Sequence, residues 1–405
     1  MIPETIIRVG PLSVECEALS VQIHHGRDDA TTQPVASTAV IELVGALPAS
    51  AVIGTRVSVW VVLGGVEHPR FEGEITDLRM GWESVDIAQP QIIATGDIGR
   101  MSRRLVGDEP WPAELDGARA ARVLDLAGFP ADPLYTDAGT VEVLAQDVDS
   151  QYALDVLHGT ANDGGGLLWQ TVAGDVLYAD AEHRRSARVV HTFDACDVGV
   201  DLGWQQSLEG LVNNLYLRYG AGVPQEEVHV QDAVSISERG RFGLSLTTAI
   251  STEADAQRRA EEIVGRQSQP SWVLGGLEVE LAFLPEPTRV TLLTAVDVHS
   301  LIAVTGLPPE SPAVDALLWV EGWRETIGGD SWLIAYATSD YCRSAATAVW
   351  DGVPQSATWD SVPSDVLWDS AICFPPSLDE GRWDQTAATD RWDTLSPDIV
   401  WDSWV

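Results

Sequence analysis

The sequence predicts a mainly β protein with an α/β insertion, in which two small β-barrel domains flank a compact α/β module and an extended arm follows. Three observations support this. Alternating apolar and polar residues, punctuated by turn residues, dominate residues 1–104 and 195–345. Helical periodicity is confined to residues 105–194 and one later stretch. A Trp-Asp pair then recurs at nine-residue intervals in two runs of three, 15 residues apart, within 346–405, the segment called here the C-terminal arm.

The first β segment, residues 1–104, is expected to contain at least five strands. Turn residues at 26–29 and 64–65 separate its alternating stretches. Short strands at this spacing favour a small barrel or sandwich. The clearest strand patterns are 13–17, 57–61, 71–78 and 91–95.

Helix signals define the module of residues 105–194. Asp116 is expected to cap one helix, which ends at Gly128, and Ser150 is expected to cap a second. The glycine-rich stretch 162–166 stops the second helix. A hairpin closes the module, with 167–169 paired to 176–178 around the turn at 173–175.

Residues 195–345 return to strand patterns and include one clear helix. Thr252 and Asp255 resemble a capping box, and an apolar face continues from Ala256 until Pro270 stops the helix. The segment therefore predicts a second β-barrel domain with one added helix. Its strands are expected over 274–283, 290–293, 317–320 and 331–337.

Composition narrows the functional classes. At 405 residues with a net charge of −37, the chain can hold two or three domains under a strongly acidic surface. All 24 basic residues are arginine, so Schiff-base catalysis by lysine and a phosphate-loop lysine are excluded. The charge argues against nucleic-acid binding, which depends on phosphate neutralisation. It suits a channel through which DNA slides without sticking, because like charges repel; a halophilic origin is the competing explanation.

The sequence shows no sign of secretion or membrane insertion. The four cysteines are far apart and lack metal-site spacing, so reduced thiols are expected. The N-terminus has no basic region followed by an apolar run, so no signal peptide is expected. No apolar stretch approaches the roughly 18 residues of a membrane span.

No group of residues predicts catalysis, a cofactor or a metal site. His24 and His25 lie near Asp28, but adjacent histidines in a strand point to opposite faces. The stretch 147–150 resembles the start of a calcium loop, yet the central glycine and final glutamate of such a loop are missing. The glycines at 164–166 follow a helix, so they do not fit a phosphate loop. We therefore expect a protein that is not an enzyme.

The C-terminal arm contains seven of the 16 tryptophans, together with 11 acidic residues and two arginines. A nine-residue step is too short for propeller blades, which repeat at about 40–45 residues. A polyproline II segment, with about three residues per turn, would return each ring to one side, and a turn in every unit is the other solution. The Trp-Asp pairs begin at Trp350, Trp359, Trp368, Trp383, Trp392 and Trp401.

These indoles cannot be buried within the arm alone. We interpret the arm as a segment that docks its rings on another surface, in this subunit or in a neighbour, with those six tryptophans as anchors. A disordered acidic tail is the alternative, favoured by the proline, serine and aspartate content. Both states can hold at different stages of assembly.

Ordered motifs across residues 5–345 carry a family resemblance. In order, the motifs are His25-Gly26-Arg27, a strand pattern at 39–43, G-x-x-V-x-V at 54–59, F-x-G-x-I at 71–75, and the stretches 94–100, 209–214 and 235–241. With these motifs the chain resembles baseplate hub or minor tail proteins, the tail-tip hub family of long-tailed phages, and most closely those of phages that infect actinobacteria. One departure is His25, where that family usually has arginine.

The resemblance implies a virion structural protein at the tail tip, made in the host cytoplasm. Hub proteins of this family form a ring, usually a homotrimer, in which two tube-like β-barrel domains per chain match a hexameric tube. The implied partners are the distal tail or tail tube protein, tail fibres or other minor tail proteins, and the tape measure protein, with DNA in transit through the lumen. The alternative hypothesis is a surface adhesin or carbohydrate-binding protein that uses the tryptophans as a stacking platform.

Overall fold

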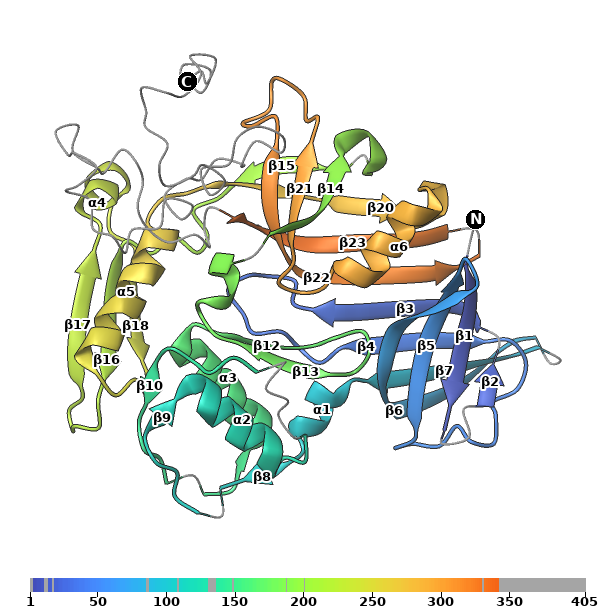
Figure 1. The fold of residues 1–405 in the computed structure, drawn as a ribbon, viewed down its shortest axis with the longest axis horizontal. Helices are drawn as coiled ribbons and strands as arrows, with labels where there is room; N and C mark the ends of the chain where they lie inside the picture. Colours follow the sequence, from blue (N-terminus) through green and yellow to red (C-terminus); the bar gives the residue numbers. More distant parts are fainter. Residues whose placement is uncertain are drawn as a thin grey trace, which may run out of the picture.

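The computed structural model describes residues 3–10, 14–16, 18–84, 87–107, 109–129, 136–147, 149–186, 188–199, 201–329 and 331–341. The fold is mainly β, as the sequence predicts, and its largest element is a sheet that curls into a half-barrel (Figure 1). Helices and smaller β units attach to this sheet.

The first β segment forms one half of the sheet, and its predicted strands are confirmed. Along β4 and β5, half-buried and buried residues alternate without interruption, because one face of each strand packs on the core. β6 pairs with β5 over its first half and with β7 over its second half, which curls the sheet. These strands are β1 (Glu4–Val9), β2 (Val14–Cys16), β3 (Ala18–Gly26), β4 (Thr38–Leu43), β5 (Arg56–Leu63), β6 (Val66–Ser84) and β7 (Ile87–Thr95).

Strands from the C-terminal part of the chain complete the same sheet. β22 pairs antiparallel with β3, and Figure 1 shows the two lying side by side. We call this pairing the seam. It merges both β segments into one sheet of 12 described strands with a shared hydrophobic core. The added strands are β14 (Val189–Asp194), β20 (Leu277–Glu280), β21 (Leu301–Thr305), β22 (Ala316–Gly328) and β23 (Ser331–Asp340).

Two glycines allow the seam to form. Gly26 and Gly322 lie opposite each other, and Gly26 adopts a φ of +76°, which favours glycine. A Cβ atom on Gly26 would overlap the carbonyl oxygen of Glu321, and one on Gly322 would overlap the carbonyl oxygen of His25. Any larger residue at either position would therefore push the two strands apart.

The α/β module packs below the sheet around its own hydrophobic cluster (Figure 1). The hairpin predicted at its end is confirmed, with Leu167 opposite Ala179. The module's elements are α1 (Asp97–Met101), β8 (Leu105–Val106), β9 (Glu114–Leu115), α2 (Asp116–Leu126), β10 (Glu142–Val143), β11 (Gln151–Tyr152), α3 (Ala153–Gly164), β12 (Leu167–Gln170), β13 (Val176–Ala179) and η1 (His183–Ser186).

Both helix caps predicted for this module are wrong. The Asp116 carboxylate does not cap α2; it accepts hydrogen bonds from the Tyr178 hydroxyl at 2.5 Å and the Thr140 amide at 2.8 Å. Ser150 also does not cap a helix, since α3 begins at Ala153. In the first case a buried tertiary contact has replaced the local one, because a buried carboxylate needs hydrogen-bond donors wherever they lie.

A third unit, with its own hydrophobic cluster, lies between β14 and β20 in the chain. Helix α5 covers a three-stranded sheet, and the Thr252 hydroxyl accepts the Asp255 amide at 3.1 Å, which confirms the predicted cap. A two-stranded ribbon of β15 and β19 connects this unit to the main sheet. Its elements are η2 (Ala195–Asp197), β15 (Gly203–Gln206), β16 (Asn214–Tyr219), β17 (Glu226–Gln231), α4 (Ala233–Arg239), β18 (Gly243–Thr247), α5 (Glu253–Gln267) and β19 (Trp272–Gly275).

Two strand predictions in the C-terminal β segment need correction. Residues 290–293 are not a strand; they lie in helix α6 (Glu286–Ala295), which starts after Pro285. The expected strand 274–283 is divided by Gly276, with a φ of +74°, and ends in η3 (Leu281–Phe283). Helices α4 and α6 therefore join α5, where the sequence indicated one helix. Short apolar runs fit either a strand or a buried helix, and periodicity alone does not separate them.

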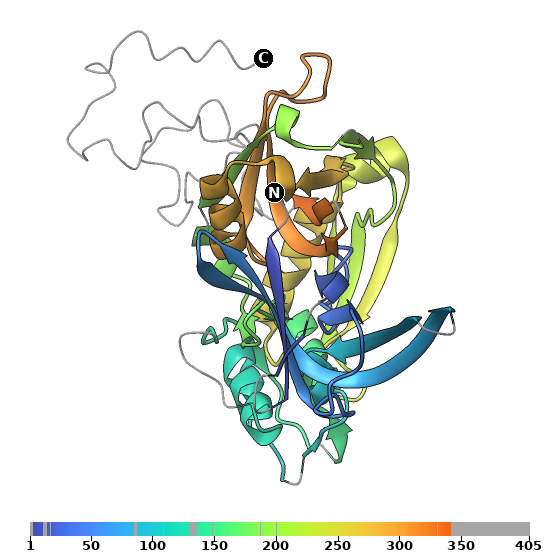
Figure 2. The same ribbon diagram turned by 90° about the vertical axis from the view of Figure 1, so that its right-hand side faces the viewer.

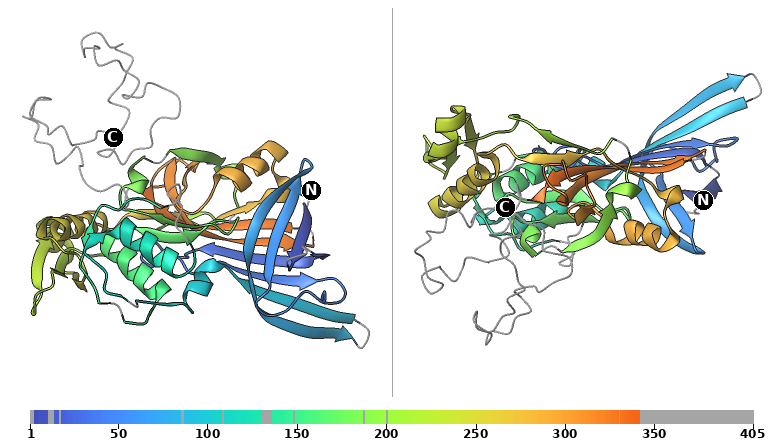
Figure 3. Two further views of the ribbon diagram at one scale, coloured as in Figure 1. Left: turned by 60° about the horizontal axis from the view of Figure 1, so that its bottom comes forward. Right: turned by 90° about the horizontal axis from the view of Figure 1, so that it is seen from above.

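The second half of β6 and the first half of β7 project from the sheet as a two-stranded ribbon, seen from two sides in Figures 2 and 3. β5 pairs with β6 only as far as Glu74, and β4 pairs with β7 only up to Gln91. The rest of the ribbon therefore has no neighbouring strand among the described residues.

Replacing Gly322 with alanine should destabilise the fold by about 2 kcal/mol, because the new methyl group overlaps backbone atoms of β3 across the seam. Urea unfolding followed by circular dichroism measures this loss. Gly275→Ala is the matched control, since it lies in strand β19 and an added Cβ meets nothing within 4 Å. Equal losses in the two variants would contradict the packing constraint at the seam.

Candidate functional site

The predicted anchors of the C-terminal arm, Trp350, Trp359, Trp368, Trp383, Trp392 and Trp401, lie outside the described residues. Their role stays a prediction. The described residues instead define the body that carries the arm. That body offers three features that bear on function: a polar sheet face, a buried charge network at the seam, and the projecting ribbon.

The sheet face opposite the core is largely polar over its central strands. We call this surface the open face. Rows of side chains continue across the seam, so that Gln22 lies between Thr326 and Val40, and both β segments contribute to one surface. Each member is half-buried or exposed. They are Ser20, Gln22, His24, Thr38, Val40, Glu42, Asp77, Arg79, Gln91, Ile93, Thr95, Arg324, Thr326, Leu333 and Ala335.

One carboxylate contacts two basic side chains of the open face. Asp28 accepts from Arg324 at 2.7 Å and lies 3.3 Å from the His24 ring nitrogen. Partial burial raises the pKa of Asp28, but the hydrogen bonds from Arg324 and His24 outweigh burial and lower it. A third basic residue, Arg79, lies opposite Gln91 on the same face and is exposed. Asp28 thus contacts two of the three basic side chains named on the open face.

The Arg70–Glu325 ion pair lies inside the core, beneath the seam. Both side chains are almost fully buried, and Arg70 donates to one Glu325 oxygen at 2.7 and 2.9 Å. The Trp332 indole donates to the other oxygen at 2.8 Å. Arg70 is the extra residue of a β-bulge opposite Val59 and Trp60, and the bulge turns its side chain inward. The pair ties β6 to β22 across the inside of the curled sheet.

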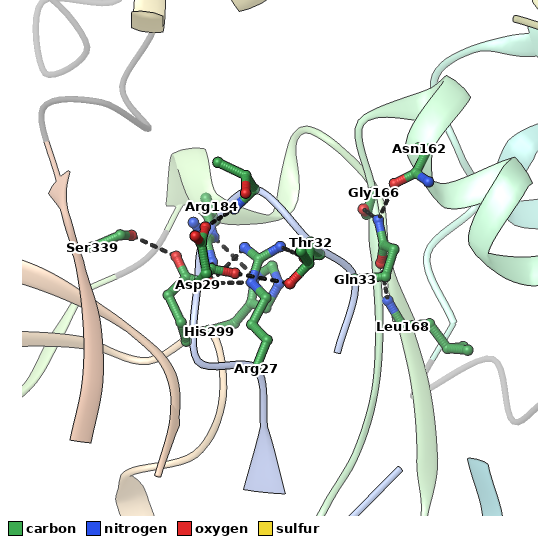
Figure 4. A network of polar contacts seen from close by, with 12 residues as sticks. Arg27, Asp29, Thr32, Gln33, Asn162, Gly166, Leu168, Arg184, His299 and Ser339 are labelled. Carbon is green, nitrogen blue, oxygen red and sulfur yellow. Dashed lines mark hydrogen bonds and ion pairs between the residues drawn. The ribbon is translucent and has the colours of Figure 1, made fainter. Parts of the chain in front are cut away.

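A second buried carboxylate, Glu321, joins three parts of the chain. Glu321 is likewise the extra residue of a bulge, in β22. It accepts from Arg27 at the end of β3 at 2.8 Å, from Arg184 in η1 at 2.9 Å, and from Ser339 in β23. Figure 4 shows these arginines and Ser339 converging. Burial raises the pKa of Glu321, but the charges of Arg184 and Arg27 outweigh it and lower that pKa to about 2.

Two buried histidines complete the network in neutral form. The His25 ring contacts the Ser37 hydroxyl and donates to the Arg70 carbonyl oxygen, each at 2.8 Å. Burial lowers the pKa of His25 to about 3. His299 accepts from Arg184 at 3.2 Å and stacks on Trp169 with ring centroids 4.8 Å apart. Burial, followed by the charge of Arg184, lowers its pKa well below the usual range.

The two histidines of the sequence motif point to different sides, as predicted. His24 reaches Asp28 at the surface, whereas His25 is buried against Ser37.

Within the described ranges, no group of three or more histidine, cysteine, aspartate or glutamate residues is arranged to hold a metal ion. In the same part of the chain, no helix has the length and apolarity needed to cross a membrane.

The projecting ribbon carries an apolar face that the sequence analysis missed. Met80 lies opposite Pro90, and Trp82 lies opposite Ala88. Met80 is 41% and Trp82 68% exposed, although both continue the row of Leu78, which packs on the core. The alternation of Leu78, Met80 and Trp82 was the available signal. This alternation is typical of any half-buried strand. Periodicity does not show where the neighbouring strand ends, so it did not indicate that Met80 and Trp82 are exposed.

Glu325→Leu should destabilise the protein by about 3–5 kcal/mol, because it leaves the Arg70 charge buried without a partner. The double variant Arg70→Met with Glu325→Leu should recover most of that loss, since it removes both charges. Urea unfolding of the single and double variants measures the coupling. Glu67→Gln breaks the exposed Arg8–Glu67 pair and should change little. A double variant no more stable than Glu325→Leu would contradict this account.

His25→Gln should make the fold less sensitive to acid. The pKa of His25 is about 3 in the folded chain against 6.5 when unfolded, so between these values the unfolded state binds the extra proton. Stability from this group is present above pH 6.5 and is lost as pH falls. Relative to the variant, the parent should lose about 1.4 kcal/mol per pH unit in that window. Urea unfolding at several pH values tests this, with the exposed His229→Gln as control. Parallel curves for parent and His25→Gln would refute it.

The described fold is similar to solved phage tail proteins. The 43 kDa tail protein of prophage MuSo2 from Shewanella oneidensis aligns with a TM-score of 0.58 at 14% identity, covering 83% of this chain and 98% of that protein. The tail protein from Neisseria meningitidis MC58 gives 0.61 at 12% identity, with 85% and 98% covered. Prophage tail protein gp18 from Listeria monocytogenes EGD-e gives 0.51 at 9%, with 82% and 94% covered. No protein-family model and no curated protein matches the chain. At these identities the likeness shows a shared fold.

Proposed function

We propose that this chain is a structural subunit of a phage tail tip or baseplate, a hub that connects the tail tube or distal tail ring to the fibres. The observation that carries the proposal is the fold match over 98% of two tail proteins. The ordered sequence motifs at residues 25–27, 54–59 and 71–75 support it independently. Actinobacterial phages are the proposed source, and the virion tail tip is the proposed location.

The open face is the proposed lining of the DNA conduit. In a ring of three copies, each chain contributes its two β segments, which would surround a central channel with six. Asp28 contacts Arg324 and His24 on this face, which weakens the attraction of these two cations for DNA phosphates. An acidic chain of net charge −37 further repels DNA and favours its free passage.

The ribbon and the C-terminal arm are the proposed contacts with other tail proteins. An isolated two-stranded ribbon is marginally stable in water, and burying Trp82 and Met80 against a partner would stabilise it. The distal tail or tube protein is its proposed partner. The tryptophans of the arm would dock in this subunit or on neighbouring subunits, fibres or other minor tail proteins. The tape measure protein would occupy the lumen before DNA release.

Light scattering coupled to size exclusion should give a trimer for the full chain, and negative-stain images should show a ring with a central hole. Antibody labelling should place the protein at one end of the virion tail.

Deleting residues 346–405 should leave the circular dichroism spectrum and the ring intact but weaken co-purification with fibre proteins.

A strictly monomeric chain that is absent from virions would overturn the hub assignment. An arm-deleted protein that assembles and infects normally would refute the role of the arm. Binding of the isolated arm to glycans would instead favour the adhesin alternative, in which the indoles stack on sugar rings.

A further inference from the structure

The nine-residue aromatic interval of the arm extends back into the described fold. Trp350 is preceded at the same interval by Tyr341 and by Trp332. Trp332 is buried in the main core. Tyr341 is half-buried, and its ring centroid lies 5.8 Å from that of Trp319. Trp332 and Tyr341, the two described aromatic residues that continue this spacing, therefore both pack against the chain's own fold.

The point where the chain leaves the described structure lies beside strand β19. The Thr338 hydroxyl donates to the Leu274 carbonyl at 2.9 Å. β20 pairs Leu277 with Tyr336, and β19 precedes it along the same side of β23. Continuing that antiparallel register places Trp272 about level with Tyr341. A chain running on from Tyr341 therefore starts next to Trp272.

Large apolar side chains are exposed around this point. Trp272 is 45% exposed, Leu208 54% and Val234 61%. Trp272 pairs with Gln206 in the ribbon of β15 and β19, two residues before Leu208. The Ser235 hydroxyl donates to the Ser268 carbonyl oxygen at 2.5 Å, which holds α4 close to the segment that leads into β19. We call Leu208, Val234 and Trp272 the exit patch. Exposed apolar residues that form a contiguous surface mark a contact site.

Chain length favours the arm of the same chain as the occupant. Nine extended residues span at most about 30 Å, so Trp350 can reach the surroundings of Trp272 from Tyr341 without a second copy. The first three Trp-Asp pairs follow at intervals of nine, whereas 15 residues separate Trp368 from Trp383. If the arm docks near the point where it leaves the fold, the loop between them is short. Closing a short loop costs less conformational entropy than closing a long one.

We propose that the exit patch binds the first run of tryptophans, Trp350, Trp359 and Trp368, of the same chain. The second run, Trp383, Trp392 and Trp401, stays available for neighbouring proteins. The assignment of the second run rests on the proposed tail-tip function; the docking of the first run does not. The longer interval between the runs then separates a segment bound to its own subunit from a segment that contacts partners.

Hydrogen–deuterium exchange of the purified chain tests this inference. Peptides covering 204–210, 232–240 and 268–275 should exchange about tenfold more slowly in the full chain than after deletion of 346–405. Trp350→Ser, Trp359→Ser and Trp368→Ser combined should reproduce the deletion. The matched triple variant Trp383→Ser, Trp392→Ser and Trp401→Ser should retain the protection. Peptides from α2 in the α/β module serve as the internal control.

Dilution separates the possible occupants. Protection that is equal at about 0.1 and about 10 μM supports docking within one chain, whereas protection lost on dilution would show a second copy as the occupant and overturn the proposal. Unchanged exchange after arm deletion, or protection that depends on the second run, would overturn it as well. The measurement uses the isolated protein, so its outcome is independent of ring assembly and virion location, which test the tail-tip function.

Discussion

The rest of the fold depends on the antiparallel pairing of β3 with β22. This pairing brings together segments that are far apart in the sequence: Arg27 and Glu321, which form an ion pair beside it, are 294 positions apart. Backbone hydrogen bonding alone would not suffice, because the strands approach too closely for any Cβ at Gly26 or Gly322. Once they pair, two β segments share one core and one open face. The curled sheet, its lining residues and the exit of the C-terminal arm all follow from that junction.

Buried charges reinforce the junction in a specific way. A buried ion pair is weak evidence for stability, because desolvation offsets most of the attraction. Here the charged groups link segments that are far apart in the sequence: Arg70 reaches Glu325 across the curl, and Glu321 contacts Arg27 and Arg184. Each group includes one side chain turned inward by a β-bulge. The bulges therefore position these side chains opposite their ion-pair partners only in the observed strand register. A shifted register would leave buried charges unpaired.

The proposed division of labour follows from where the exposed groups lie. The open face is largely polar, and two of its basic side chains contact Asp28, which suits the proposed passage of DNA. Exposed apolar residues include Trp82 on the projecting ribbon and Trp272 at the exit patch. The proposed conduit and the proposed partner contacts therefore involve different residues. Shared fold with tail proteins of 9–14% identity indicates that this architecture tolerates nearly complete sequence change.

The sequence by itself determined the mainly β class, the strands with regular alternation such as β4 and β5, the hairpin of β12 and β13, and the Thr252 cap, because each depends on neighbours within a few residues. It misplaced Asp116 and Ser150 and took the helix at 290–293 for a strand. The tertiary structure alone decided the seam, the inward turn of Arg70 and Glu321, and the exposure of Trp82 and Trp272. Those features depend on which distant segments meet, and local periodicity carries no record of a neighbour hundreds of residues away.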